Sequence, residues 1–466
     1  MIDVGNKIRE HSLPVTKFHI HSGSKPLFSF DFSLIHSDQN INNIFSFPQY
    51  QLEELLERKY LSLGGEITYG AELISIRQDE TSVISDILVD DKQITATSSF
   101  LVGCDGAHST TRSFTSCKME GHSYDNTFIV ADGILQPDHK DMYIDFDAGH
   151  TFISREGYTM LFPLPGGRHR VVIDGNPDSP PLDLDALHSA LTDRGFSHLK
   201  FQTLDWLSNA VLNAKVADKY NFKRIALAGD ACHLHSPVGG QGINLGVQDS
   251  FNLAWKLSQV LQHNMHPDVI SSYSDERRIV AKKVIANTDK LHNMLVSRSP
   301  LTSLARNSFL PLLSKAPSIQ RSIAADLSGI TTSYRSLYLT DKSSSNISKG
   351  DRIPNVTLHQ EGCTTTLYDL INKPQHSLIL VSQSGSFENI KTSRPEDIIM
   401  ISTTPCASPK ENVYHTHDPT FTSILSRKSG SAFLVARPDG HLHHIEPITS
   451  DRTIENAINL AMLDNT

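Results

Sequence analysis

One glycine-rich string limits the folds open to this chain more than any other feature. It runs from Ala228 to Gly246 and contains Gly229-Asp230 and Gly239-Gly240-Gln241-Gly242. The apolar run 224–228 precedes it, and a long helical pattern follows. A buried strand, a glycine-rich turn and a helix in this order predict an α/β fold, in which ligands bind at the carboxyl ends of the strands. We call residues 228–246 the glycine loop.

The residue types of the glycine loop suit a flat, charged ligand. Asp230 ends the strand with a carboxylate, and the glycines let backbone approach a ring closely. The helix that follows points its positive end at the same place, so free N–H groups at Ile243 and Asn244 would stabilise negative charge. The structural alternative is a glycine turn that only closes a strand-helix connection. The length of the string favours the ligand.

A second string reads Gly103-Cys104-Asp105-Gly106-Ala107-His108-Ser109-Thr110-Thr111-Arg112, here called the Asp-Gly loop. An Asp-Gly pair after a strand is often only a turn, but Ser109 and Arg112 add polar groups that favour a ligand-binding role. A third candidate is Gln49, which follows Pro48 at the start of a helix pattern that ends at 64–65. Taken alone, Gln49 is a solvated helix residue.

Together these strings resemble the FAD-dependent aromatic-ring hydroxylases, the group of para-hydroxybenzoate hydroxylase and phenol hydroxylase. The resemblance continues through Asp249 to Leu257, and Tyr273-Ser274-Asp275-Glu276-Arg277-Arg278 resembles a helix that we interpret as structural. By resemblance, the cofactor-binding residues are Gln49, Asp105, Gly106, Gly229, Asp230, Pro237, Gly239, Gly240, Gln241, Gly242, Ile243 and Asn244. No residue is assigned as a catalytic acid or base.

The resemblance implies an α/β fold of the glutathione-reductase-like Rossmann kind. It places an FAD-binding monooxygenase-type region at 1–340, with β-rich substrate-domain parts at about 12–36 and 124–215. A serine-rich linker at 341–350 follows. The segment 351–466 resembles a thioredoxin-like domain without the redox CxxC, on the basis of 350–355 and 434–440.

The reaction implied by the resemblance is hydroxylation of a phenolic or related aromatic compound. FAD is the cofactor, NADPH or NADH is a transient co-substrate, and dioxygen reacts to give a flavin C4a-hydroperoxide. Two alternatives stay open: a truncated, non-catalytic paralogue that acts as a binding protein, and an oxidase or epoxidase of the same superfamily with a non-aromatic substrate. A homodimer is also compatible with the sequence.

One expected segment has no counterpart. Relatives begin with a βαβ unit carrying GxGxxG, which seats the pyrophosphate of the cofactor, and this chain resembles the family only from about residue 10. Its absence leaves FAD affinity open and predicts that strand 224–228 and the helix packed on it are exposed. A start codon placed too far downstream and a shortened paralogue both explain the absence. We favour the first, and reading the coding frame upstream of Met1 would test it.

Composition excludes several classes. The net charge of −9 argues against a nucleic-acid partner. No apolar run is long enough for a membrane-spanning helix, and residues 1–7 lack a secretory signal. The five cysteines, Cys104, Cys117, Cys232, Cys363 and Cys406, form no CxxC pair and indicate reduced thiols in the cytoplasm. The histidines at 415, 417, 441, 443 and 444 have no completing ligand set, so we expect surface histidines and no metal.

Overall fold

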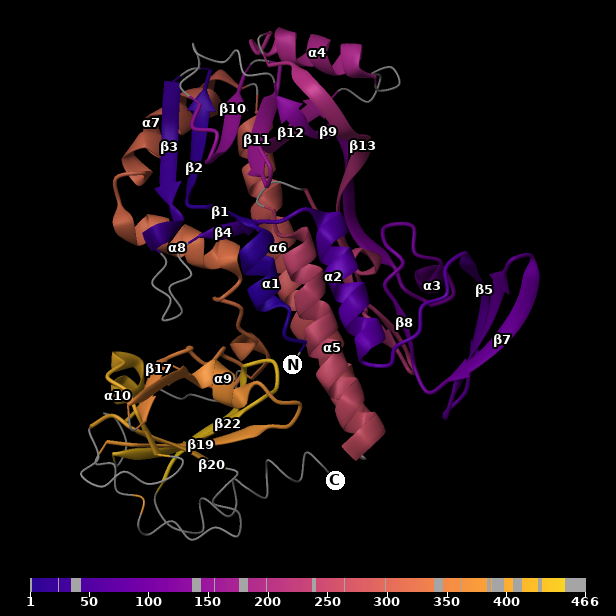
Figure 1. Ribbon diagram of the computed structural model, residues 1–466, viewed down its shortest axis with the longest axis vertical. Helices are drawn as coiled ribbons and strands as arrows, with labels where there is room; N and C mark the ends of the chain where they lie inside the picture. The colour runs from indigo at the N-terminus through magenta and orange to yellow at the C-terminus, as the bar shows by residue number, and fades with distance from the viewer. Residues whose placement is uncertain are drawn as a thin grey trace.

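A computed structural model describes residues 2–23, 25–34, 43–135, 144–154, 156–175, 183–197, 199–236, 240–263, 265–297, 299–338, 347–360, 362–383, 387, 398–404, 413–425 and 430–448. In these residues the chain is an α/β protein, as the sequence predicts. Figure 1 shows a large twisted sheet, two long helices that run side by side, and the C-terminal sheet as a separate layer. The described helices include none that is both long and apolar enough to cross a membrane.

The largest sheet has the strand order β16-β13-β9-β12-β11-β10-β2-β3. Its strands are β2 (Lys17–Ser22), β3 (Lys25–Asp31), β9 (Met119–Leu135), β10 (Gly149–Ile153), β11 (Tyr158–Leu164), β12 (Arg168–Gly175), β13 (Phe201–Ala217) and β16 (His233–Leu234). One face packs Phe28 and Phe128 against helices, and the other packs Leu161 and Ile173 against α4 (Leu184–Asp193). Apolar side chains on both faces explain why these strands are not strictly alternating in sequence.

A small sheet carries the two loops of interest. It has the order β14-β15-β8, formed by β14 (Asn221–Phe222), β15 (Ile225–Leu227) and β8 (Leu101–Gly103). The expectation that strand 224–228 is exposed was wrong: Ile225 and Leu227 are only 2% and 0% exposed. The neighbouring strands and helices cover β15, and the exposure falls instead on β8, where Val102 is 37% exposed.

Further elements precede β9 in the chain. They are α1 (Gly5–His11), β1 (Leu13–Val15), β4 (Ile44–Ser46), α2 (Gln49–Ser62), β5 (Ala71–Gln78), β6 (Val83–Val89), β7 (Lys92–Ser98) and α3 (Thr110–Ser113). In the sequence, the Asp90-Asp91 pair predicts a hairpin turn. The structure confirms it, since both residues have positive φ, at 47° and 60°, between β6 and β7. Such angles are tolerated best by glycine, asparagine and aspartate, which explains the aspartates at this turn.

Four helices follow the glycine loop in the chain. They are α5 (Gly242–His263), α6 (Ser271–Val296), α7 (Pro300–Leu313) and α8 (Pro317–Ser328). The sequence predicts one helix over 301–323, but the structure breaks it at 314–316, because Pro317 cannot continue a helix that needs its N–H. The expected exposure of the helix packed on this strand holds for one flank of α5 only: Val247 and Leu261 are 53% and 54% exposed, whereas Leu245 and Leu253 are 3% and 2% exposed.

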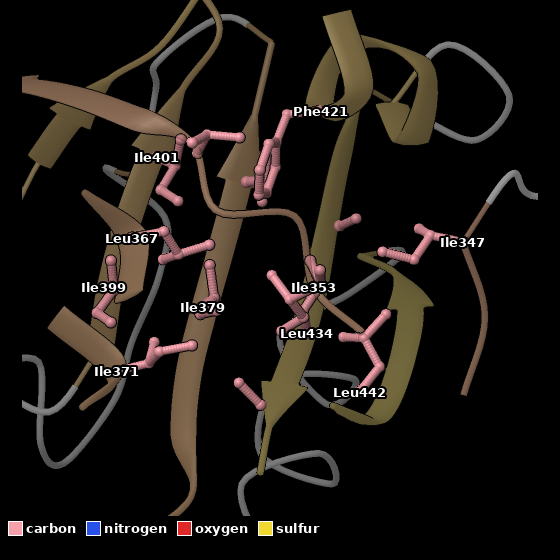
Figure 2. Packing of buried hydrophobic residues seen from close by; sticks show 14 of the residues in the cluster. Ile347, Ile353, Leu367, Ile371, Ile379, Ile399, Ile401, Phe421, Leu434 and Leu442 are labelled. Atoms are coloured by element: carbon pink, nitrogen blue, oxygen red, sulfur yellow. The ribbon is translucent and has the colours of Figure 1, made fainter. Parts of the chain in front are cut away.

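The C-terminal segment folds around its own core. Its sheet has the order β18-β17-β21-β20-β19-β22-β23. Its elements are β17 (Thr357–Gln360), β18 (Cys363–Thr366), α9 (Leu367–Ile371), β19 (Ser377–Ser382), β20 (Ile398–Ser402), β21 (Val413–His415), α10 (Pro419–Leu425), β22 (Ser431–Ala436) and β23 (Leu442–Pro447). Figure 2 shows Ile379, Ile401, Phe421 and Leu434 packed in this core. In the sequence, the apolar run 378–381 predicts a strand and Pro438-Asp439-Gly440 predicts a hairpin turn. The structure confirms both, as β19 and as the β22–β23 pair.

Candidate functional site

The structure brings the glycine loop and the Asp-Gly loop together. They leave the carboxyl ends of the parallel strands β15 and β8, where the amide of Ala228 donates to the carbonyl of Gly103 at 3.0 Å. The guanidinium of Arg112 joins the loops, because it donates to the carbonyl oxygens of Ala107 at 2.8 Å and of Ala231 at 3.0 Å. Two strings far apart in the sequence therefore form one surface.

Gly229 lies where the strand meets the helix. It has φ +62°, and a Cβ added there would lie 3.9 Å from the Cα of Gly246 in the first turns of α5. The reciprocal approach, from a Cβ on Gly246 to the Cα of Gly229, is 3.4 Å. A side chain at residue 229 would be strained by the positive φ. The two glycines thus let the loop and the helix backbone pack closely.

Asp249 holds the glycine loop from behind. Its fully buried carboxylate accepts from the amide of Gly229 at 3.2 Å and lies 2.6 Å from Nε2 of His233. The other oxygen accepts from Nε of Arg277 at 2.7 Å. Burial raises the pKa of Asp249, but His233 and Arg277 outweigh burial and keep this pKa below its ordinary value. Sequence analysis matched Asp249 and Arg277 to the family pattern and missed their role as anchors of the loop.

The front of the glycine loop is open. Asp230 is exposed, and its carboxylate accepts no hydrogen bond from any residue that the structure describes. The first intrahelical bond of α5 runs from Leu245 N–H to the carbonyl of Gln241 at 2.9 Å. The preceding amides, those of Ile243 and Asn244 among them, therefore have no acceptor inside the helix. A free carboxylate beside free amides fits a cofactor that carries both hydroxyl groups and an anionic edge.

Four other predicted cofactor-binding residues belong to the glycine loop, and the structure describes two of them. The side-chain amide of Gln241 donates to the carbonyl oxygens of Asp326 at 3.2 Å and Leu327 at 3.4 Å, so it faces α8. Gly240 has φ +63° and open space where a Cβ would stand. Pro237 and Gly239 lie outside the described residues.

Asp105 is turned into its own loop. Its carboxylate accepts from the hydroxyl of Ser109 and from the amide of Thr111 at 2.8 Å. Partial burial raises the pKa of Asp105, but these hydrogen bonds outweigh it and lower the pKa overall. Asp105 thus shapes the Asp-Gly loop and the start of α3. Gly106, at φ +78° with no atom within 4 Å of an added Cβ, presents bare backbone.

Gln49 stands at the start of α2, as predicted, and is exposed. Its side-chain amide donates to Glu53 at 2.9 Å, one turn further along the same helix. Within the described part of the chain, no hydrogen bond joins Gln49 to either loop. Its assignment as a cofactor contact stays a prediction.

A cavity of about 310 Å³ opens beside the start of α5. Asn244 and Gln248 of α5, Val280 and Lys283 of α6, and Leu327 of α8 belong to its lining. Its volume lies in the lower range of small-molecule sites. The cavity adjoins the glycine loop on the side of Gln241, whereas Asp230 does not line it.

Within the described part of the chain, the cysteines and histidines form no second candidate site. Burial raises the pKa of Cys104 and Cys232 and raises the pKa of Cys117 to about 11, which favours unreactive thiols; Cys406 lies outside the described residues. One expectation was wrong: His441 is 5% exposed and stacks on Tyr334, with ring centroids 4.3 Å apart. Among the described residues no cluster of His, Cys, Asp and Glu is placed to hold a metal.

An α/β frame with two loops gathered at a helix N-terminus is typical of proteins that bind a nucleotide-type cofactor. The model of the family described as FAD binding domain matches residues 2–288. This match spans more than half of the chain, and the chain belongs to that family. The match confirms the resemblance to FAD-dependent hydroxylases and gives FAD as the cofactor of the family.

Relatives extend this assignment. The chain is 29% identical to pentachlorophenol 4-monooxygenase of Sphingobium chlorophenolicum over 71% of its own length and 60% of that protein. It is 26% identical to 12-dehydrotetracycline 5-monooxygenase/anhydrotetracycline 6-monooxygenase of Streptomyces rimosus over 85% and 76%. The chain thus spans less than two thirds of the first relative and about three quarters of the second.

Solved structures share the fold. The anhydrotetracycline hydroxylase OxyS of Streptomyces rimosus has a TM-score of 0.75 at 23% identity, over 99% of this chain and 87% of that one. CabE, an aromatic hydroxylase from angucycline biosynthesis, has a TM-score of 0.72 at 23% identity, over 96% and 85%. These likenesses show the fold of flavin-dependent monooxygenases.

Proposed function

We propose that this chain acts as an FAD-dependent monooxygenase that hydroxylates a phenolic or related aromatic compound. NADPH or NADH serves as reductant and dioxygen as oxygen donor. The observation that carries the proposal is the glycine loop, which Asp249 anchors from behind and which leaves the Asp230 carboxylate and the α5 amides free in front. The names of the relatives, a pentachlorophenol and an anhydrotetracycline monooxygenase, support the aromatic substrate class.

We propose that different residues of the chain contact different parts of FAD. We assign Asp230 to the hydroxyl groups of the ribityl chain, and the amides of Ile243 and Asn244 to the ring edge that becomes anionic on reduction. The bare backbone at Gly106 and Gly240 leaves space for close approach. When bound and reduced, FAD supplies the activation of dioxygen. The protein orients the ring and excludes water around it.

We propose that the cavity beside α5 takes the aromatic substrate. It has apolar walls, such as Val280 and Leu327, and polar groups at Asn244 and Lys283. A mixed lining of this kind holds a flat ring and fixes its orientation through a few polar contacts. Filling the cavity with Val280→Phe is expected to raise KM for the aromatic substrate and leave FAD binding unchanged.

We also propose that residues 351–466 form a thioredoxin-like domain, joined by 341–350 to an FAD-binding region at 1–340. In support, β19 and β20 are parallel neighbours, and β22 and β23 form an antiparallel hairpin beside β19. A homodimer is part of the proposal too, and the molecular mass in solution tests it.

The deciding experiment is a titration of the purified protein with FAD. We expect a bound-flavin visible spectrum, and Asp230→Asn should weaken FAD binding about tenfold, because a charged acceptor is lost. Asp193→Asn, at an exposed carboxylate of α4, is the matched control and should leave FAD affinity unchanged.

Turnover completes the test. NADPH consumption should rise with some members of a panel of phenols and polyketide-like aromatics. A chain that stays colourless with excess FAD would overturn the proposal and favour the binding-protein alternative. Flavin binding with stimulation only by non-aromatic substrates would favour the oxidase or epoxidase alternative.

A further inference from the structure

A buried cluster of charges joins the C-terminal segment to the long helices. Arg437, between β22 and β23, donates through Nη2 to Glu276 of α6 at 2.8 Å and through Nε to Asp439 at 3.0 Å. Lys256 of α5 donates to the same Glu276 at 2.9 Å. All four side chains are 4% exposed or less. The two cations lower the pKa of Glu276 to about 2 despite its burial.

Hydrogen bonds continue from this cluster toward α5 and Tyr334. Asp439 accepts from Nδ2 of Asn252 and Nε1 of Trp255, both at 3.1 Å. The hydroxyl of Tyr334 lies 3.4 Å from Nδ2 of Asn252 and accepts from Nη1 of Arg277 at 3.2 Å. The chain of contacts therefore reaches Arg277, which belongs to the glycine-loop anchor.

The last two contacts in this series belong to the anchor of the glycine loop. Arg277 donates to Asp249, and Asp249 accepts from the amide of Gly229. The contacts thus run without a break from the C-terminal segment to the glycine loop. Buried hydrogen bonds in such a network strengthen and orient one another, because no water competes for the same groups.

We propose that Asp439 and Arg437 are positioning residues for the glycine loop. They hold Asn252 and Glu276 through hydrogen bonds. Asn252 contacts the hydroxyl of Tyr334, and this hydroxyl accepts from the Arg277 side chain that orients Asp249. The C-terminal segment then acts on cofactor binding although, among the described residues, no hydrogen bond or ion pair joins it directly to either loop. If these contacts were purely structural, they would hold the C-terminal segment against the long helices. Changing them would then not affect hydrogen exchange at the Gly229 amide.

The test compares two carboxylates of the C-terminal segment. Asp439→Asn removes the charge inside the network and keeps the side-chain size. Asp369→Asn is the matched control, because Asp369 caps α9 and takes no part in the network. Hydrogen exchange followed by mass spectrometry reads the segments 228–234 and 377–382 in each full-length variant.

We expect Asp439→Asn to speed exchange in 228–234 about tenfold, the effect of losing a charged hydrogen bond, with 377–382 unchanged. Asp369→Asn should leave 228–234 unchanged. Equal exchange at 228–234 in Asp439→Asn and the wild type, or an equal rise in the control, would overturn the proposal.

Tyr334→Phe decides the case if Asp439→Asn does not fold, since it removes only the bridging hydroxyl. Tyr368→Phe is its control: that hydroxyl contacts Arg352 and Ile353 inside the C-terminal segment. FAD titration adds an arm that rests on the proposed function, with the dissociation constant for FAD expected to rise about tenfold in Tyr334→Phe. If the wild type binds no FAD, the proposed function fails while hydrogen exchange still judges this inference.

Discussion

The two flanks of α5 differ in the side chains that each buries or exposes. Besides Leu245, Leu253 and Trp255, the flank that meets the C-terminal segment and α6 buries four polar or charged side chains, namely Asp249, Asn252, Lys256 and Gln259. The opposite flank exposes apolar side chains, with Ile243 47%, Val247 53% and Leu261 54% exposed. On α5, partner groups decide which polar residues are buried, since each buried charge there has an opposite charge beside it.

The largest effect on stability should come from breaking ion pairs at the flank of α5 that buries Asp249 and Lys256, here called the charged flank. Arg437→Met leaves Glu276 and Asp439 with fewer partners, and we expect a loss of about 3 to 5 kcal/mol in the free energy of unfolding. Urea denaturation followed by circular dichroism measures it. Arg168→Met is the control, because Arg168 pairs with Asp205 at the surface, 44% and 38% exposed. Its loss should be about 0 to 1 kcal/mol, and equal losses would erase the difference between the flanks.

A second pair of variants compares leucines within α5. Leu253 is 2% exposed in the core, whereas Leu261 is 54% exposed. Leu253→Ala should lower the free energy of unfolding by about 2 to 5 kcal/mol, since it removes buried methyl groups and leaves a cavity. Leu261→Ala should change it by about 0.5 kcal/mol or less. Thermal and urea unfolding of both variants checks this, and a large effect at Leu261 would mean that its flank is covered in solution.

This contrast also marks the limit of reading α5 from its sequence. Spacing identified the helix, its glycine loop and the strand before it, because these depend on local residue types. Spacing does not show which flank is buried: apolar residues such as Val247 and Leu261 would suggest a buried face, but both are more than half exposed. Burial depends on which distant segments pack on the helix, and Arg437 and Asp439 lie far along the chain.

The same reason explains what was missed in the site. The residues of both loops were found from their patterns, and the structure places the loops together. The anchoring role of Asp249 was missed because it needs the geometry of His233 and Arg277, which no spacing rule supplies. Gln241, which faces α8, shows the converse: a matched position does not fix the direction of its side chain.

A moderate effect on stability is expected from mild acid. It should act through the buried histidines of the large sheet and not through the charged flank of α5. His21 lies 3.1 Å from His150 (Nε2 to Nδ1), and burial with neighbouring imidazoles lowers the pKa of His21 to about 4. The unfolded chain then binds more protons between about pH 6.5 and 4, so stability falls as the pH drops through this window. Glu276, with its pKa lowered to about 2, loses its contribution only below about pH 4.5.

Mild acid should therefore lower the free energy of unfolding through the histidines of the large sheet and leave the contribution of Glu276 unchanged. Between pH 7 and pH 5 the wild type should lose about 1 to 2 kcal/mol through His21, and His21→Phe should lose correspondingly less over the same range. Urea midpoints at the two pH values give the comparison. An unchanged pH dependence in His21→Phe would show that the buried imidazoles do not set acid sensitivity, and His266→Phe, at a histidine that is 73% exposed, is the control.

The smallest effect on stability is expected on the exposed flank of α5. Its size tests directly whether this flank is exposed in solution. Ile243→Ser removes an apolar side chain that is 47% exposed, so the free energy of unfolding should change by about 0.5 kcal/mol or less. Binding of a hydrophobic dye and concentration-dependent light scattering should both decrease, because the apolar patch shrinks. Ile225→Ser, in the buried strand β15, is the matched control and should be strongly destabilising. A substantial destabilisation by Ile243→Ser would mean that this flank is covered in solution. Both flanks of α5 would then be buried, and they would differ only in the groups that pack against them.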